Sequence, residues 1–193
     1  MMQCAILDDY QQIAASSADW GRLAPHVAVR FVPDYLAGED QVVEALAGVE
    51  IVVAMRERTP FRKSLIDRLP ALRLLITTGM RNGAIDIAAA HARGVTVCGT
   101  EGVGRPTSEL TWALILAATR RLETECANMR AGRWQTTVGG DLHGRTLGLI
   151  GLGTQGSQVA AVGKAFGMDV IAWRQNLTEE RCAALGVRRA ASL

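Results

Sequence analysis

Three glycines between residues 151 and 156 form the pattern most directly tied to chemistry. The pattern is G-x-G-x-x-G, and it joins an apolar run ending at Ile150 to an amphipathic segment beginning at Ser157. In a strand–turn–helix unit such glycines allow a tight turn, close approach of a pyrophosphate, and packing of the helix on the strand. The N–H groups and dipole of the helix N-terminus also favour phosphate. The alternative is a purely structural glycine-rich turn. The predicted cofactor-binding residues here are Gly151, Gly153, Thr154, Gln155 and Gly156.

The residue after the next strand-like run, Asp169–Trp173, bears on the choice of cofactor. Units that prefer NAD usually carry an acidic residue at the end of this strand, about 20 residues past the first glycine, where it binds the ribose hydroxyls. Arg174 occupies that position, whereas Asp169 lies at the start of the strand. Because arginine pairs with a 2′-phosphate, we expect Arg174 to contact the cofactor. The sequence therefore predicts NADP or NAD, with NADP favoured.

Two loops in the first hundred residues are further candidates for ligand binding. The loop 77–83 follows one strand-like run, and Arg56 and Arg58 follow another. Ligands of open α/β sheets bind at the carboxyl ends of the strands, where the two arginines add positive potential. The alternatives are an ordinary strand–helix turn and solvated loop arginines. The tandem Asp8 and Asp9 are typical of a turn or helix start, and no metal site is predicted.

Strand-like and helix-like segments alternate through residues 1–100. Short apolar strands separated by helices indicate an α/β fold with a parallel sheet covered on both faces. Gly48, Pro70 and Gly94 stand at the expected element boundaries. The predicted strands are Gln3–Leu7, Val27–Val32, Glu50–Ala54, Leu72–Thr77 and Val95–Cys98, and the helices are Asp19–Leu23, Glu39–Leu46, Arg62–Leu69 and Ile85–Arg93.

One long helix is predicted from Thr107 to Arg130, capped by Thr107 or Ser108. Its segment Leu110–Ala118 is apolar on nearly every side, which is typical of a helix buried between domains or subunits. Residues 131–142 are expected to form an irregular arm with Trp134 as a packing anchor. The nucleotide-type unit begins near Gly144.

The composition of the chain limits the classes of protein and of partner that need to be considered. The chain has 193 residues, 49% of them hydrophobic, with 21 basic and 19 acidic side chains and a net charge of +2. These charges are spread along the chain, so we expect a solvated surface and no nucleic-acid partner. Four distant cysteines indicate free thiols in a reducing cytoplasm. No secretory signal or membrane-length apolar run is visible, and we expect no membrane association.

Six segments spread along the chain carry a resemblance to a known family. They are residues 54–61, 69–82, 94–98, 108–116, 132–134 and 142–153, including Ser-Glu-Leu-Thr-Trp-Ala-Leu-Ile-Leu and Leu-His-Gly-Arg-Thr-Leu-Gly-Leu-Ile-Gly-Leu-Gly. Together they resemble the D-isomer-specific 2-hydroxyacid dehydrogenases. The resemblance implies a flavodoxin-like substrate domain (1–100), an interdomain helix and dimerisation arm (101–143), and an incomplete Rossmann NAD(P)-binding domain (144–193), with a homodimer as the full-length form.

The resemblance also implies hydride transfer between a nicotinamide and a D-2-hydroxy acid or 2-keto acid. Backbone N–H groups around Gly79, Met80 and Arg81 would hold the substrate carboxylate, with Arg56 adding positive charge. Most family members have an asparagine about six residues before the glutamate of the long helix, where it forms a polar contact with the substrate. This chain has Val103 at that position.

The family's catalytic arginine, acidic residue and histidine are expected beyond Leu193, so no catalytic residue is assigned. His26, His91 and His143 do not match the family pattern. We expect a C-terminally truncated chain that is inactive alone. The alternatives are a non-catalytic dinucleotide-binding or regulatory module, and a remnant that only dimerises or fails to fold.

Overall fold

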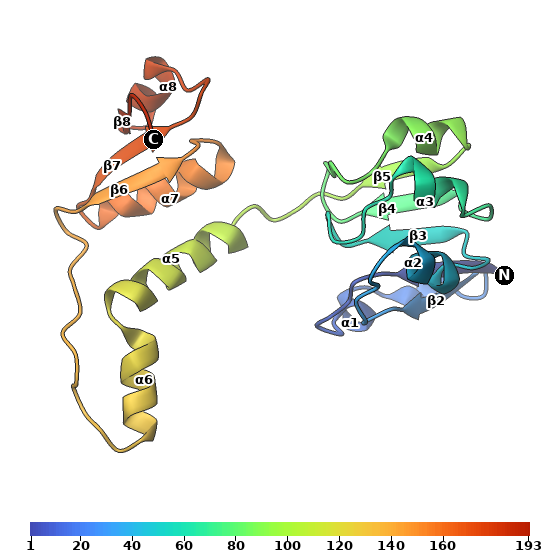
Figure 1. Cartoon of the computed structure of the whole chain (residues 1–193), viewed down its shortest axis with the longest axis horizontal. Coiled ribbons are helices and arrows are strands. Elements are labelled where there is room, and N and C mark those ends of the chain that lie inside the picture. Colours follow the sequence, from blue (N-terminus) through green and yellow to red (C-terminus); the bar gives the residue numbers. More distant parts are fainter. The chain divides into compact units, whose positions relative to one another are not determined.

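The computed structural model describes all residues from Met1 to Leu193, which form two compact units, Met1–Gly102 and Val103–Leu193. Each unit contains its own parallel β-sheet with helices packed against it (Figure 1). An α/β fold is therefore confirmed. No helix in the chain combines the length and the apolar composition that crossing a bilayer requires.

The sheet of the first unit has five parallel strands in the order β2-β1-β3-β4-β5. This order is that of flavodoxin-like folds, as predicted. The register aligns Ala5, Val52 and Leu75, all fully buried, across the three central strands. The strands are β1 (Met2–Ile6), β2 (Val27–Phe31), β3 (Ile51–Ala54), β4 (Leu74–Thr77) and β5 (Thr96–Gly99).

One face of this sheet carries the main core, because α2, α3 and α4 pack their apolar side chains onto it. The strands β3, β4 and β5 follow one another in one direction across the sheet, and because crossovers between parallel strands are right-handed as a rule, their helices are expected on the same face. On the other face, Trp20 packs against Phe31 beside β1. The helices are α1 (Ala14–Ser17), the 3-10 turn η1 (Trp20–Leu23), α2 (Glu39–Ala45), α3 (Lys63–Asp67) and α4 (Ile87–Ala92).

The prediction that both faces are covered is correct only near β1, where Cys4 and Ile6 are buried. At β3 and β4, the side chains on this second face are only half-buried: Ile51, Val53, Leu74 and Ile76.

The second unit contains the predicted strand–turn–helix, the predicted strand that follows it and one further β-strand. Its three strands are parallel in the order β6-β7-β8, and α7 and α8 pack on them around Ala160, Val170 and Cys182. The helix after the glycine turn begins three residues earlier than predicted, and α8 and β8 are additional. The elements are β6 (Thr146–Ile150), α7 (Thr154–Ala165), β7 (Asp169–Trp173), α8 (Glu179–Ala184) and β8 (Arg188–Arg189).

The predicted single helix from Thr107 to Arg130 is wrong, since the structure has α5 (Pro106–Thr119) and α6 (Leu122–Arg130). Arg121 adopts a left-handed conformation with φ of 53°, which ends one helix and turns the chain into the next (Figure 1). The predicted cap is also wrong. The N-cap residue is Arg105, because Pro106 fits the first turn of a helix, where no N–H is needed.

The arm after α6 is held by polar contacts. The Asn128 side chain is buried, and its Oδ1 accepts hydrogen bonds from the Arg133 guanidinium. Glu125 accepts a hydrogen bond from the Thr137 hydroxyl, which lowers the pKa of the Glu125 carboxyl. The expectation that Trp134 is a packing anchor is wrong within this chain, because its side chain is 70% exposed.

Candidate functional site

The glycine turn joins β6 to α7, and its first and last glycines are required by the backbone itself. Gly151 has a φ of 98°, a conformation that L-residues with side chains rarely adopt. A Cβ atom at Gly156 would lie 2.3 Å from the Gly151 carbonyl oxygen. The end of the strand and the first turn of the helix can approach this closely only with glycine at both positions.

Gly153 differs from its two neighbours in the motif. Its φ is −80°, which any residue can adopt, and a Cβ atom there would meet no protein atom within 4 Å. No side chain caps α7, and the Gly153 carbonyl accepts the first intrahelical bond, from the Ser157 N–H. The preceding N–H groups of the helix N-terminus therefore remain available beside an open space, as a bound pyrophosphate requires.

Thr154 and Gln155 supply the first N–H groups of α7, but the side chain of Gln155 is already engaged. Its Nε2 atom donates to the Gly104 carbonyl oxygen at 2.8 Å, and its Oε1 atom is buried without a partner. Gln155 therefore offers a nucleotide its backbone N–H, while the Thr154 side chain is exposed.

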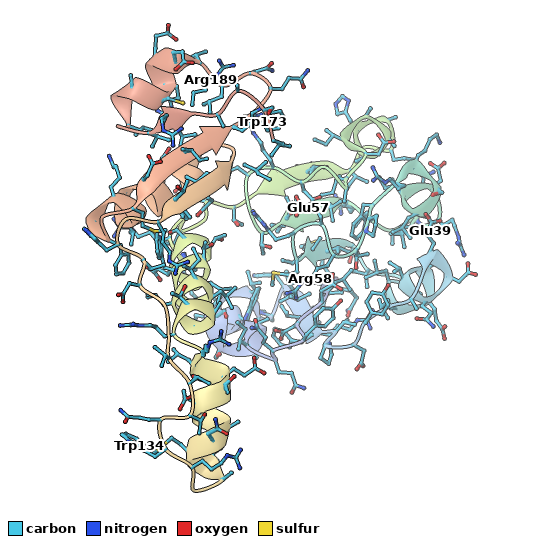
Figure 2. The ribbon with its side chains drawn as sticks, turned by 60° about the vertical axis from the view of Figure 1, so that its left-hand side comes forward. Glu39, Glu57, Arg58, Trp134, Trp173 and Arg189 are labelled. Carbon is cyan, nitrogen blue, oxygen red and sulfur yellow. The ribbon has the colours of Figure 1, made fainter.

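Arg174 follows β7 directly and is exposed. The Gly151 N–H donates to the Trp173 carbonyl oxygen at 2.8 Å, which places the end of β7 beside the glycine turn. Figure 2 labels Trp173, which precedes this position. The structure thus brings Arg174 and the glycines together at one edge of the second sheet.

The predicted substrate loop lies at the carboxyl edge of the first sheet, where β4 ends. Gly79 has a φ of 116°, and a Cβ there would overlap the Arg56 guanidinium at 2.0 Å from Nη1. Arg56 Nη1 donates to the Thr78 carbonyl oxygen at 3.3 Å, so its guanidinium lies directly against the loop. The structure therefore brings Arg56 and Gly79 together.

The N–H of Gly79 is not free, because it donates to Thr100 Oγ1 at 3.0 Å. The N–H groups of Met80 and Arg81 have no acceptor in the protein. Both residues are exposed, and the Arg81 side chain forms no ion pair. Two free backbone donors and two arginines thus belong to the loops at this edge.

A cluster of polar side chains surrounds Asp8, and no pattern in the sequence predicts it. The Asp8 carboxylate is buried and accepts hydrogen bonds from Tyr10 Oη and Thr59 Oγ1, both at 2.9 Å. Arg58 Nη1 donates to the Asp8 carbonyl oxygen at 2.8 Å, and its guanidinium carbon lies 4.7 Å from the Tyr10 ring centroid. The cluster joins the ends of β1 and β3, the point where strand order reverses and where such sheets bind ligands. Figure 2 labels Arg58 in the loop after β3.

The environment of this cluster changes the titration of Tyr10. Loss of solvation around the hydroxyl raises its pKa, and the hydrogen bond to Asp8 raises it further. The neighbouring Asp9 has a different role, since its carboxylate accepts the Ile13 and Ala14 N–H groups at the start of α1. The expectation of a helix-start feature is therefore correct for Asp9.

No group of three or more His, Cys, Asp or Glu side chains is arranged to hold a metal ion. All four cysteines are free thiols, and burial raises the pKa of the Cys4 and Cys182 thiols. The histidines lie away from both carboxyl edges. His26 precedes β2, His91 is in the last turn of α4, and His143 lies against Gly167 before β7.

Comparisons with known proteins agree on one family. A family model described as "D-isomer specific 2-hydroxyacid dehydrogenase, NAD binding domain" matches residues 112–193. The chain is 30% identical over 152 residues to a D-3-phosphoglycerate dehydrogenase from Methanocaldococcus jannaschii, covering 77% of this chain and 29% of that protein. It is 39% identical over 117 residues to a glyoxylate reductase from Aeropyrum pernix, covering 55% and 35% respectively.

A solved structure of a phosphoglycerate oxidoreductase from Vibrio cholerae matches with a TM-score of 0.89 and 36% identity. The match covers 100% of this chain and 62% of that one. The chain thus spans 29% and 35% of the lengths of the two curated relatives and under two thirds of the solved structure.

The contrast between Gly153 and Gly156 yields a stability prediction. We expect Gly156→Ala to lower the free energy of unfolding by roughly 1–3 kcal/mol, because its Cβ would overlap backbone that cannot move aside. Gly153→Ala is the matched control, with an expected cost of about 1 kcal/mol or less, because its φ suits alanine and its Cβ would meet no protein atom, so that only the N-cap preference for glycine over alanine is lost. Urea unfolding followed by circular dichroism measures both. Equal losses in the two variants would contradict this account of the turn.

The Asp8 cluster yields a pH prediction. In a Tyr35→Phe background, Tyr10 is the only tyrosine, and its absorbance change at high pH is expected to have a midpoint above 10. Because the folded pKa is raised, the stability from the protonated hydroxyl is fully present below the unfolded pKa of Tyr10. It is lost as pH rises through the folded pKa.

Adding Asp8→Asn removes the carboxylate charge and its hydrogen bond, and should move this midpoint downward. A midpoint that stays in place with the fold intact would show that Asp8 does not influence Tyr10.

Proposed function

Because the chain belongs to the D-isomer-specific 2-hydroxyacid dehydrogenase family, we propose that it binds a nicotinamide dinucleotide on its glycine turn and a small 2-keto or 2-hydroxy acid beside β4. The reaction is hydride transfer between the nicotinamide and a D-2-hydroxy acid. The observation that carries the nucleotide part is the open space at Gly153, where the protein's own packing does not require a glycine. Gly151, Gly153, Thr154, Gln155 and Gly156 form the pyrophosphate site.

The substrate carboxylate binds to the free N–H groups of Met80 and Arg81, with Gly79 providing the space for the loop's tight conformation. Arg56 and Arg81 add positive charge that stabilises the carboxylate and the neighbouring carbonyl oxygen. Arg56 is suited to this role because its contact with the Thr78 carbonyl fixes its guanidinium against the loop. When bound, the nicotinamide supplies or accepts the hydride, while these residues bind and orient the acid.

Residues 1–193 bind the cofactor and the acid. They supply no general acid or base to exchange the proton of the substrate hydroxyl. None of the three histidines lies at either carboxyl edge, and we assign no other general base. The same observation favours a second candidate function, a non-catalytic dinucleotide-binding or regulatory module. Binding of a 2-keto acid near Met80, seen as chemical-shift changes, supports the enzyme reading, whereas binding of the dinucleotide alone supports the module.

We propose further that residues 101–143 form an interdomain helix and a dimerisation arm within a cytoplasmic homodimer. Leu110 and Leu114 of α5 and Trp134 of the arm are between 60% and 70% exposed, and large apolar side chains of this kind gather at subunit interfaces. The four free thiols suit a reducing compartment.

The nucleotide site is tested by Gly153→Ala. We expect this variant to bind NADP and NAD at least about tenfold more weakly, because the added methyl group occupies the space of the pyrophosphate. Isothermal titration calorimetry measures both affinities, and the urea experiment above separates binding from folding. Unchanged affinities for both cofactors would refute the glycine turn as their site.

The cofactor preference is tested by Arg174→Asp. We expect the unaltered protein to bind NADP more tightly than NAD, and the variant to reverse this order, because aspartate repels a 2′-phosphate and accepts bonds from ribose hydroxyls. Arg145→Gln, at the opposite edge of the sheet, is the charge control and should bind both cofactors normally. Tighter NAD binding by the unaltered protein would rule out the preference.

A further inference from the structure

A second arginine reaches the glycine turn from α8. Arg181 Nη2 lies 3.1 Å from Ser157 Oγ, in the first turn of α7, and 3.5 Å from the carbonyl oxygen of Leu152. Leu152 is the residue between the first two glycines of the motif. The Thr178 hydroxyl caps α8 by accepting the Arg181 N–H, which fixes the start of the helix. Arg181 is therefore held beside the turn by contacts from both helices.

The charges around this arginine are unbalanced. Residues 144–193 contain six basic and three acidic side chains, and each acidic one is already engaged. Asp169 pairs with Arg188, and Glu179 pairs with Arg189, which Figure 2 labels. Glu180 accepts a hydrogen bond from its own backbone N–H, with the Thr178 hydroxyl as a second donor, and these bonds lower its pKa. No carboxylate therefore pairs with Arg174 or Arg181.

Both uncompensated arginines belong to the same edge of the second sheet. The bond from the Gly151 N–H to the Trp173 carbonyl joins the chain before Arg174 to the first residue of the turn. Arg181 contacts the next residue of that turn, Leu152. Two exposed guanidinium groups thus flank the strand end and the turn, with no competing anion from the protein.

We propose that Arg181 is a second specificity-determining residue, which together with Arg174 binds the 2′-phosphate of an adenosine nucleotide. The inference rests on the proposed nucleotide site and extends it. A phosphate dianion has three acceptor oxygens, and two guanidinium groups supply enough donors to satisfy them, whereas a ribose hydroxyl needs neither. Ser157 is the positioning residue, because its hydroxyl oxygen holds the Arg181 guanidinium in place.

The competing role for Arg181 is a structural tie between α8 and the glycine turn. A tie would support every nucleotide equally, since its loss would distort the pyrophosphate site shared by all of them. A 2′-phosphate ligand would discriminate between nucleotides that differ only at that position. The two roles therefore differ in selectivity, which binding measurements report without any turnover.

The test compares adenosine 2′,5′-bisphosphate with 5′-AMP, which lacks only the 2′-phosphate, by calorimetry on the full 193-residue chain. The unaltered protein should bind the bisphosphate more tightly. Arg181→Gln should weaken bisphosphate binding by about tenfold or more, as expected for losing a charge-assisted hydrogen bond, and leave 5′-AMP binding unchanged. Ser157→Ala should produce a smaller loss of the same selectivity, and Arg145→Gln should produce none.

Equal weakening of both ligands in Arg181→Gln would identify a structural tie and overturn the proposal, as would unchanged binding of both. A preference of the unaltered protein for 5′-AMP would overturn it while leaving the dinucleotide site standing. Failure of the unaltered protein to bind either ligand or NAD would refute the proposed nucleotide site and this inference together.

Discussion

The close contact between Gly151 and Gly156 is the constraint on which the second unit depends. It lets β6 pass into α7 within one turn, which keeps the strand paired with β7 and leaves the first N–H groups of the helix unbonded. Further along α7, a Cβ at Gly163 would lie 2.7 Å from Leu147, so the helix also lies unusually close to the sheet. The available donors at the helix start are thus a consequence of how strand and helix are joined.

Three loop residues of the first unit have left-handed backbone conformations at the edge of the sheet where we place the acid. Asp8, Arg56 and Gly79 all have positive φ, and they follow β1, β3 and β4 respectively. Such conformations persist only where surrounding contacts fix them. Here the Asp8 carboxylate, the Thr78 hydroxyl and the Thr100 hydroxyl provide those contacts. The hydrogen bonds that hold the loops also occupy backbone N–H groups. The Gly79 N–H is one of them, so Gly79 contributes space in the loop and no free donor.

The sequence predicts those features that arise from local patterns. Short apolar runs place the strands of the first unit within two residues of their observed bounds, and β7 matches fully. The break at Arg121 has no glycine or proline to announce it, and α8 and β8 are short and polar. The Asp8 cluster joins residues about 50 positions apart, so no local pattern reveals it.

The three glycines of the motif therefore differ in what the structure requires of them. Gly151 and Gly156 are explained by the chain's own backbone, and they would be needed in a turn that binds nothing. Gly153 has an ordinary φ and no neighbour that a side chain would touch, so packing gives no reason for it. The open space beside Gly153, at the start of α7, is what the proposed pyrophosphate site would need. Backbone packing thus explains Gly151 and Gly156, and the nucleotide site that we propose adds a reason for Gly153.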